Sequence, residues 1–307
     1  MLSLRRNRSA RLRATMRAAG VVLLGALLTG CGSFQPAPTE TRVVASGEFE
    51  VSIEQGLMVI NAVINGEHPV RMVLDTGADA TVLTPAAVER IGLDTKPMMR
   101  IVRGAKGGGL EGSRAPVSSL DLGGLVLSEF NALVLGLAPI QRRLDRPVDG
   151  VVGWPAFRDA ELSVDWANGR ISTGGLREPG SVAYPLTSRR ATIEAPIFGT
   201  SREYLVDTGY NGTLAVRRSD LARLTTQNLG EQSITGAYRS GTEERFRVDE
   251  QTAFGGARIP AAEVVVTDGT RVMGSGWMRR FTVTFDQPAG EIRFLDLARK
   301  RPAVEPE

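Results

Sequence analysis

The sequence is very poor in cysteine and histidine. Its 307 residues include one cysteine, Cys31, and one histidine, His68. One cysteine cannot form a disulfide within the chain. One histidine excludes a multi-histidine metal site and leaves at most a single side chain for a Ser/His/Asp or Cys/His arrangement. His68 stands beside Pro69, which indicates a surface turn. We therefore expect chemistry that requires no metal and no other cofactor.

The N-terminus lacks an apolar run long enough to span a bilayer. Residues 18–30 are uncharged and largely apolar, and six arginines precede them. This pattern predicts a secretion signal over residues 1–30. The signal ends in Leu28-Thr29-Gly30-Cys31, which resembles a bacterial lipobox. The resemblance implies that Cys31 is the lipid attachment site, so that no thiol remains for catalysis, and that residues 31–47 are a tether to the membrane.

The rest of the chain has no excess of basic charge. The formal net charge is +3, and the six arginines are the only charged residues of the signal, so the remainder carries 3 − 6 = −3. We therefore expect no nucleic-acid partner, and we interpret the arginine pairs at 189–190, 217–218 and 279–280 as solvated faces. Gly32 rather than aspartate follows Cys31, as in lipoproteins sent to the outer membrane. We expect the protein in the cell envelope, lipid-anchored in the outer membrane and facing the periplasm.

A short motif occurs twice in the sequence. An apolar run at 70–74 leads to Asp75-Thr76-Gly77-Ala78, and a second run at 204–206 leads to Asp207-Thr208-Gly209-Tyr210. The two aspartates are 207 − 75 = 132 residues apart, and the turn glycines Gly124 and Gly256 have the same offset, 256 − 124 = 132. A constant offset over this distance predicts a duplicated unit.

The offset becomes smaller further along the chain. Val151-Val152-Gly153 matches Val272-Met273-Gly274 with 274 − 153 = 121, which an insertion of 11 residues in the first copy explains. We place this insertion in residues 136–150, which have no periodicity and are interpreted as a surface loop. The repeat then predicts two lobes, residues 48–176 and 184–297, with a linker at 177–183 and a tail at 298–307.

Both lobes are predicted to be mainly β, because short apolar runs alternate with turn signals. Asn65-Gly66 predicts a hairpin whose second strand ends at Asp75. A short helix is expected after each aspartate loop, the first capped by Thr84 and ended by Gly92, the second at residues 219–224. The glycine-rich segment 98–117 predicts a β-hairpin, with a counterpart whose tip is at 236–241. Lys106 is not followed by Ser or Thr, which argues against a phosphate-binding loop.

Two aspartates related by a pseudo-twofold axis can act on one water molecule. Carboxylates about 3 Å apart cannot both be ionised, so the pair shares a proton. One carboxylate then acts as a base on the water while the protonated one polarises a peptide carbonyl. The repeat therefore predicts Asp75 and Asp207 as the catalytic pair.

The doubled motif resembles the aspartic peptidases, the group of pepsin and the retropepsins. The resemblance implies a mainly β fold of two homologous β-barrel-like lobes with short helices, in which an apolar-apolar-Gly strand crosses behind each aspartate loop. It also implies a polypeptide substrate. The first loop, with Ala78 and Asp79, is more similar to retropepsins. The two-lobed single chain is the pepsin arrangement, so we expect a monomer with a complete site.

The same resemblance assigns residues to substrate binding. The glycine-rich hairpins occupy the position of the family's flaps, which close over bound peptide. Tyr238, near the second tip, has an alternative interpretation as a solvent-exposed tyrosine of the hairpin. The residues assigned to substrate binding are Thr76, Gly77, Thr208, Gly209, Gly107, Gly108 and Tyr238.

Two positions depart from the pepsin pattern. Pepsins usually have Ser or Thr after Asp-Thr-Gly, which donates to the carboxylate, whereas this chain has Ala78 and Tyr210. Fewer donors to the charged form predict higher pKa values for the dyad and activity at higher pH than that of pepsin. Tyr210 either crowds the second loop or packs outward.

Three functions remain open from the sequence. The first is an aspartic endopeptidase tethered to the cell envelope. The second is a catalytically inactive lipoprotein that binds peptides or a partner on the same fold, which Tyr210 and the unequal flaps favour. The third is a glycosidase with the two aspartates as acid and base, although the sequence has no aromatic sugar platform near either loop.

Overall fold

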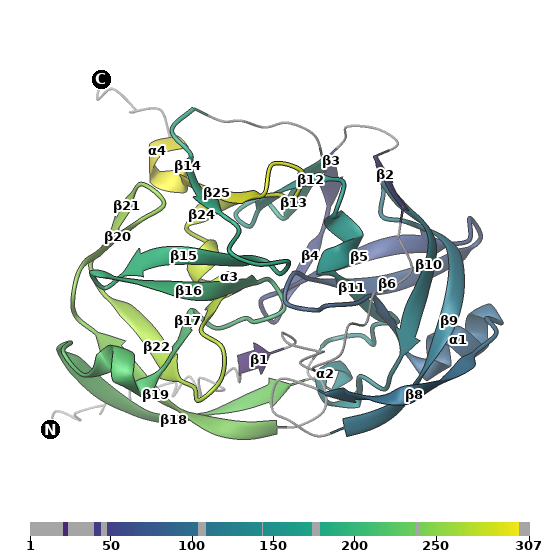
Figure 1. Cartoon of the computed structure of the whole chain (residues 1–307), viewed down its shortest axis with the longest axis horizontal. Coiled ribbons are helices and arrows are strands. Elements are labelled where there is room, and N and C mark those ends of the chain that lie inside the picture. Colours follow the sequence, from purple (N-terminus) through teal and green to yellow (C-terminus); the bar gives the residue numbers. More distant parts are fainter. Residues whose placement is uncertain are drawn as a thin grey trace, which may run out of the picture.

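The computed structural model describes residues 21–23, 40–43, 48–103, 109–142, 144–173, 179–236 and 240–300. Cys31, the predicted lipid attachment site, lies outside these ranges, as do Gly107, Gly108 and Tyr238 of the predicted flaps. The described chain is mainly β, as the sequence predicts, and its two lobes lie side by side in Figure 1.

The first lobe is a closed barrel. Its ladder runs β10-β7-β11-β6-β5-β9, and β9 pairs back with β10. Closure removes the open strand edges that would otherwise invite aggregation. The strands of this lobe are β2 (Glu40–Val43), β4 (Ser52–Glu54), β5 (Leu57–Ile64), β6 (His68–Asp75), β7 (Val82–Leu83), β8 (Lys96–Arg103), β9 (Gly109–Asp121), β10 (Leu125–Val134) and β11 (Gly150–Gly153).

The second lobe repeats this order without closing within the described residues. Its ladder runs β18-β19-β22-β17-β23-β16-β15, and a short strand inside the predicted secretion signal, β1 (Val21–Leu23), pairs in parallel with β18. The strands of this lobe are β15 (Thr192–Ile197), β16 (Thr200–Asp207), β17 (Leu214–Val216), β18 (Thr226–Gly236), β19 (Ser240–Val248), β20 (Thr252–Phe254), β21 (Ala257–Ile259), β22 (Ala262–Val266) and β23 (Val272–Gly274).

A third sheet joins the lobes, at the top of Figure 1. Its order is β14-β25-β24-β12-β13-β3, and the central pair, β12 with β24, brings one strand from each repeat together. At its centre the hydroxyls of Ser163 and Thr284 lie 2.7 Å apart. The strands are β3 (Glu48–Glu50), β12 (Glu161–Asp165), β13 (Arg170–Thr173), β14 (Val182–Pro185), β24 (Phe281–Asp286) and β25 (Glu291–Asp296).

The helices are short. The helix α1 (Pro85–Ile91) is capped as predicted, because the Thr84 hydroxyl accepts from the Ala87 amide at 3.2 Å and Gly92 ends the helix with a φ of 75°. The helix predicted at 219–224 is instead the 3₁₀ turn η2 (Arg218–Leu221). The others are α2 (Ala138–Gln141), η1 (Trp154–Phe157), α3 (Ser275–Met278) and α4 (Leu297–Lys300). No helix in the described ranges is long and apolar enough to cross a bilayer.

The interpretation of residues 136–150 as a surface loop is wrong. The segment contains α2, and Leu137, Ile140, Leu144 and Val148 are buried in one cluster with Ala78 of the first aspartate loop. The sequence shows no periodicity there because irregular backbone carries these apolar side chains inward. The insertion therefore fills the space behind the first loop, and α2 also contacts β18 of the other lobe.

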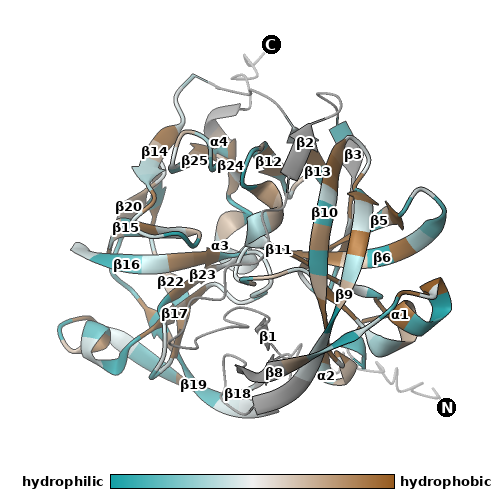
Figure 2. Cartoon of the chain, turned by 45° about the vertical axis from the view of Figure 1, so that its right-hand side comes forward, coloured by the Kyte–Doolittle hydropathy of each residue, from teal (hydrophilic) through white to brown (hydrophobic). Residues whose placement is uncertain are grey.

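One continuous hydrophobic core runs through both lobes and the joining sheet. Trp154, Trp166 and Trp277 are buried in this core. The Trp154 indole donates to the Arg189 carbonyl at 3.0 Å, so it also links the lobes. Figure 2 shows β16 changing from hydrophilic at its outer end to hydrophobic toward the centre, and the last four residues of this strand, which end at Asp207, are buried.

Candidate active site

Each aspartate is the last residue of a hairpin strand. The strand β6 is paired with β5 and ends at Asp75, and β16 is paired with β15 and ends at Asp207. On its other side each strand pairs in parallel with the short apolar strand of the repeat, so that Gly153 is opposite Asp75 and Gly274 is opposite Asp207. Each carboxylate is thus positioned by three strands of its own lobe.

The two crossing glycines permit a close approach of backbones. A Cβ atom on Gly153 would lie 2.4 Å from the Ala80 oxygen, and one on Gly274 would lie 2.3 Å from the Gly212 oxygen. Both distances are far below van der Waals contact, so any larger residue would push the aspartate loop out of place. This is the physical reason for the matched glycines that define the repeat.

The two loops hold each other through their threonines. The Thr76 hydroxyl donates to the Val206 carbonyl at 2.6 Å and accepts from the Thr208 amide at 3.1 Å. The Thr208 hydroxyl does the reverse, donating to the Leu74 carbonyl at 2.8 Å and accepting from the Thr76 amide at 3.0 Å. Both threonines are buried. Their side chains therefore fix the two loops against each other, and their predicted contact with substrate stays a prediction.

The carboxyl groups face one another across the interface. A Cβ on Gly77 would lie 2.4 Å from Cγ of Asp207, and one on Gly209 would lie 2.5 Å from Cγ of Asp75. Each aspartate accepts the amide of its own loop glycine through Oδ1, at 2.8 Å in both cases. The Oδ2 atoms of both are buried and have no hydrogen-bond partner among the described residues. They are therefore available to a reacting molecule.

Burial makes ionisation of this pair costly. Both aspartates are fully buried. Burial, and then the neighbouring charge of Asp207, raise the pKa of Asp75 well above its usual value, although the amides of Gly77 and Ala78 oppose this. Burial raises the pKa of Asp207 to about 6, while the neighbouring Asp75 side chain, the Gly209 amide and the charge of Arg190 work in the opposite direction. The pair therefore holds a proton under mildly acidic conditions.

Arg190 is a site residue that the sequence interpretation missed. Its Nε donates to Asp79 at 2.8 Å and its Nη2 donates to the Gly77 carbonyl at 2.9 Å, so an arginine of the second lobe binds the first aspartate loop. The interpretation of residue 190 as part of a solvated face is wrong. Burial raises the pKa of the Asp79 carboxyl and the Arg190 charge opposes this.

Different contacts hold the second loop. Asn211, which is 132 positions after Asp79, donates through Nδ2 to the Gln55 carbonyl at 2.6 Å. The Ser275 hydroxyl donates to the Gly56 carbonyl at 2.7 Å. A turn of the first lobe thus contacts the second loop through neutral main-chain groups.

The Tyr210 ring packs within the second lobe and not between the carboxylates. It is fully buried in a cluster with Ala215, Val265 and Val272. A Cβ on Gly212 would lie 2.4 Å from its hydroxyl oxygen, so Gly212 makes room for the ring. Burial, with the charges of Glu243 and Asp207, raises the pKa of Tyr210 well above its usual value. The predicted outward packing is therefore wrong: the ring is buried inside the second lobe, against Gly212 of its own loop.

The predicted flaps are the hairpins β8–β9 and β18–β19, which approach each other at the bottom of Figure 1. Their strands confirm the predicted hairpins. The tip residues assigned to substrate binding, Gly107, Gly108 and Tyr238, lie outside the described residues, so their roles stay predictions.

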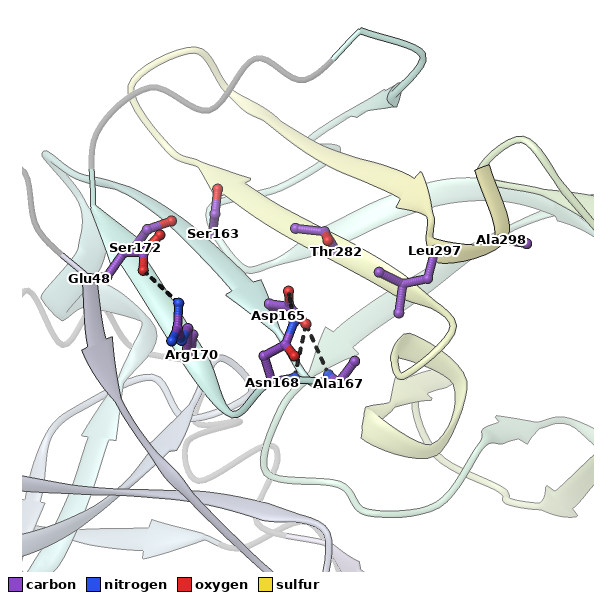
Figure 3. A pocket seen from close by; sticks show the side chains of 10 residues that line it. All are labelled: Glu48, Ser163, Asp165, Ala167, Asn168, Arg170, Ser172, Thr282, Leu297 and Ala298. Carbon is purple, nitrogen blue, oxygen red and sulfur yellow. Dashed lines mark hydrogen bonds and ion pairs between the residues drawn. The ribbon is translucent and has the colours of Figure 1, made fainter. Parts of the chain in front are cut away.

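A cavity of about 800 Å³ lies elsewhere, on the joining sheet (Figure 3), and none of its lining residues belongs to the aspartate loops. Its charged groups already have partners: Asp165 accepts the Ala167 amide, and Arg170 pairs with Glu48. No group of three metal-ligating side chains occurs in the part of the chain that the structure describes.

Comparison with known proteins agrees with this geometry in the first lobe. A comparison with curated proteins finds no match. Residues 60–156 match the family model for aspartyl proteases. The matched region runs from β5 to η1 and includes Asp75, the crossing strand β11 and Gly153. This match supports an aspartic peptidase family for the protein.

Proposed function

We propose that this protein is an aspartic endopeptidase of the cell envelope that hydrolyses peptide bonds with water activated between Asp75 and Asp207. The observation that carries the proposal is the facing pair of buried carboxyl groups, each packed against the loop glycine of the other lobe, with a free Oδ2 on each. The aspartyl protease match over residues 60–156 supports peptidase activity.

The reaction needs one proton on the pair. The ionised carboxylate takes a proton from water, and the oxygen of that water attacks the peptide carbonyl carbon. The protonated carboxyl group gives its proton to the carbonyl oxygen, which produces a tetrahedral diol. The carboxyl group that took the proton from water then gives it to the peptide nitrogen. As the C–N bond breaks, a hydroxyl of the diol returns its proton to the other carboxylate, so that the dyad again holds one proton.

We expect the substrate to be an extended polypeptide that lies between the lobes and the flaps. The edge of β18 already accepts an extended apolar segment, since β1 pairs with it in parallel from Val21 opposite Ile234 to Leu23 opposite Gly236. Main-chain hydrogen bonds of this kind give affinity without fixing the side chains of the peptide. We therefore propose main-chain recognition of substrate, with Gly107, Gly108 and Tyr238 closing over it.

Location is part of the proposal. Cys31 at the end of the predicted signal is the proposed lipid attachment site, residues 31–47 are the tether, and the outer membrane facing the periplasm is the proposed location. Because one chain contributes both aspartates, the proposed active form is a monomer.

The direct test is cleavage of a library of unstructured peptides by the purified protein, analysed by mass spectrometry. We expect new termini to appear with the wild type and to be lost with Asp75→Asn and with Asp207→Asn. The exposed Asp94→Asn is the control and should cleave like the wild type. Peptide binding without cleavage in all four proteins would instead establish the inactive binding protein.

The pH dependence of the same cleavage gives a second readout. Since burial raises the pKa of Asp207 to about 6 and that of Asp75 well above its usual value, the singly protonated dyad forms as the pH rises through about 6. We expect kcat/KM to rise through this range. A protein that is active only below about pH 4 would contradict the proposal that burial controls this dyad.

A further inference from the structure

The contacts on the two sides of the dyad differ in charge. Asp79 and Asn211 occupy equivalent positions, since 211 − 79 = 132. The first is ion-paired with Arg190 of the opposite lobe, with side chains that are both 24% exposed. The second binds a neutral main-chain carbonyl of the opposite lobe. The duplication is therefore symmetric in its backbone and asymmetric in its electrostatics.

The guanidinium of Arg190 reaches toward Asp207 through Gly77. Its Nη2 donates to the Gly77 carbonyl at 2.9 Å. The same glycine packs directly on the other carboxyl group, because a Cβ on it would lie 2.4 to 2.6 Å from the carboxyl atoms of Asp207. The positive end of the Asp79–Arg190 ion pair is thus one residue away from Asp207, in a partly buried place where water screens the charge less than at the surface.

Among the described residues, the corresponding contacts on the Asp75 side include no partly buried cation. Gly209 packs on the Asp75 carboxyl group, and the second loop is held by the Asn211 amide and the Ser275 hydroxyl. The guanidinium of Arg279 lies beside Gly56 in the contacting turn, but Arg279 is exposed and solvent screens its charge.

We propose that Arg190 is a positioning residue that places the negative charge of the dyad on Asp207 and leaves the shared proton on Asp75. The other charged or titratable groups around the dyad are Asp79, which the ion pair neutralises, and Tyr210 and Glu243, which are buried on the second-lobe side. A charged Glu243 would disfavour an anion on Asp207, so the effect of Arg190 opposes it.

This assignment rests on the proposed function and gives each aspartate its role. Asp207 takes the proton of the attacking water, and Asp75 gives its proton to the carbonyl oxygen of the peptide. Burial raises the pKa of both carboxyl groups; the Arg190 charge opposes this rise at Asp207, whereas the Asp207 charge adds to it at Asp75.

The test is a titration that does not require cleavage. The full chain, labelled with ¹³C at the aspartate carboxyl carbons and held in detergent micelles, is titrated by NMR, with Asp75→Asn and Asp207→Asn used to assign the two signals. We expect the Asp207 carbon to dominate the lower of the two ionisation steps and the Asp75 carbon the upper one. The opposite order would overturn the proposal.

Two substitutions separate charge from packing. In Arg190→Gln we expect the lower step to move up by about half a pH unit or more. Arg190→Lys keeps the cation and should restore most of the separation. The exposed Arg170→Gln, on the joining sheet, is the control and should leave both steps in place. A lower step that stays unchanged in Arg190→Gln would mean that Arg190 only joins the lobes. If Arg190→Gln does not fold, the order of steps in the wild type decides alone.

Kinetics then connect the charge to the reaction. The acid limb of the kcat/KM profile should shift up in Arg190→Gln and return in Arg190→Lys, whereas loss of packing alone would change the rate at every pH equally. Absence of cleavage by the wild type would end the proposed function. The NMR titration of Arg190→Gln against the wild type would still decide whether Arg190 polarises the two carboxyl groups.

Discussion

At the scale of single residues, the site depends on two buried threonines, Thr76 and Thr208, whose hydroxyls both donate and accept hydrogen bonds. The threonine hydroxyls satisfy four main-chain groups across the lobe interface. Removing one hydroxyl leaves buried donors and acceptors without partners, which costs more than the hydrogen bond itself contributes.

Thr208→Val tests the cost of losing one of these hydroxyls. It leaves the Leu74 carbonyl and the Thr76 amide unpaired, so we expect the free energy of unfolding to fall by about 2 to 4 kcal/mol and kcat to fall with it. Chemical denaturation and the peptide assay measure the two effects. Thr208→Ser keeps the hydroxyl and should cost less than about 1 kcal/mol. Equal losses in the two variants would show that the methyl group, and not the hydrogen bonds, matters.

The dyad also makes stability depend on pH. Because the pKa of Asp207 is raised to about 6 in the folded state, the wild type loses stability as pH rises from the unfolded pKa through about 6. Asp207→Asn has no charge to bury at this position. Its free energy of unfolding relative to the wild type should therefore increase between pH 4 and pH 7, by on the order of 3 kcal/mol. Thermal unfolding at both pH values measures this. A difference that is the same at both would contradict the costly burial of the charge.

The sequence identifies some of these residues and hides others. Asp75 and Asp207 follow from the repeat alone, because the motif, the offset and the downstream glycines agree. Arg190 could not be found in this way, since its partners Asp79 and Gly77 are more than a hundred residues earlier and meet it only after the lobes pack. Two adjacent arginines are typical of a solvated face, and local composition cannot reveal an interlobe contact.

At the scale of elements, the two lobes fill the same space in different ways. Behind the first loop, Ala78 is small and the inserted segment with α2 supplies Leu137, Ile140 and Leu144. Behind the second loop the chain has no insertion, and the Tyr210 ring occupies the cluster with Ala215 and Val265. The large residue in one repeat and the extra loop in the other are therefore alternative ways to fill the cavity behind an aspartate loop.

Substitutions at these two places should behave accordingly. Ile140→Ala and Tyr210→Ala should each lower the free energy of unfolding by about 3 kcal/mol, because both remove fully buried side chains. Tyr210→Phe removes a hydroxyl that has no partner in the described residues and should be neutral or stabilising by up to about 1 kcal/mol. Ile53→Ala, at a position 37% exposed, is the control. Denaturant titration measures all four, and a large loss in Tyr210→Phe would contradict this packing.

Sequence patterns predicted regular elements better than irregular ones. The hairpin at Asn65-Gly66 and the capped helix α1 were predicted because turn and cap residues act locally. The burial of residues 136–150 was not, since neither a helical nor a strand period is present where loop backbone carries apolar side chains. The second short helix was predicted over residues 219–224, but the structure has only the single 3₁₀ turn η2 there.

At the scale of the whole molecule, the joining sheet and the shared core make the lobes one structure. The buried Arg293 binds Asp286, Glu291 and Glu161, so it links both repeats at the edge of the central strand pair. The duplication predicted the two-lobed architecture, but the sequence could not show that the first sheet closes into a barrel while the second stays open in the described residues.

The proposed lipid anchor acts on the molecule as a whole. Cys31→Ser removes the acyl acceptor, so we expect the protein to move from the membrane fraction to the soluble periplasmic fraction with unchanged peptidase activity per molecule. Cell fractionation followed by the peptide assay measures both. Retention of the variant in the membrane fraction would contradict the anchor and leave the catalytic proposal untouched.

The central claim is that Asp75 and Asp207 together stabilise a tetrahedral diol at the peptide carbonyl. Its most direct test is calorimetric binding of two peptides that share the sequence preferred in the library, one with a hydroxymethylene group and one with a plain methylene in place of the scissile carbonyl. We predict that the hydroxyl-bearing peptide binds at least about a hundredfold more tightly, as transition-state mimics do, and that Asp75→Asn and Asp207→Asn abolish the difference. Equal affinity of the two peptides for the wild type would contradict the account.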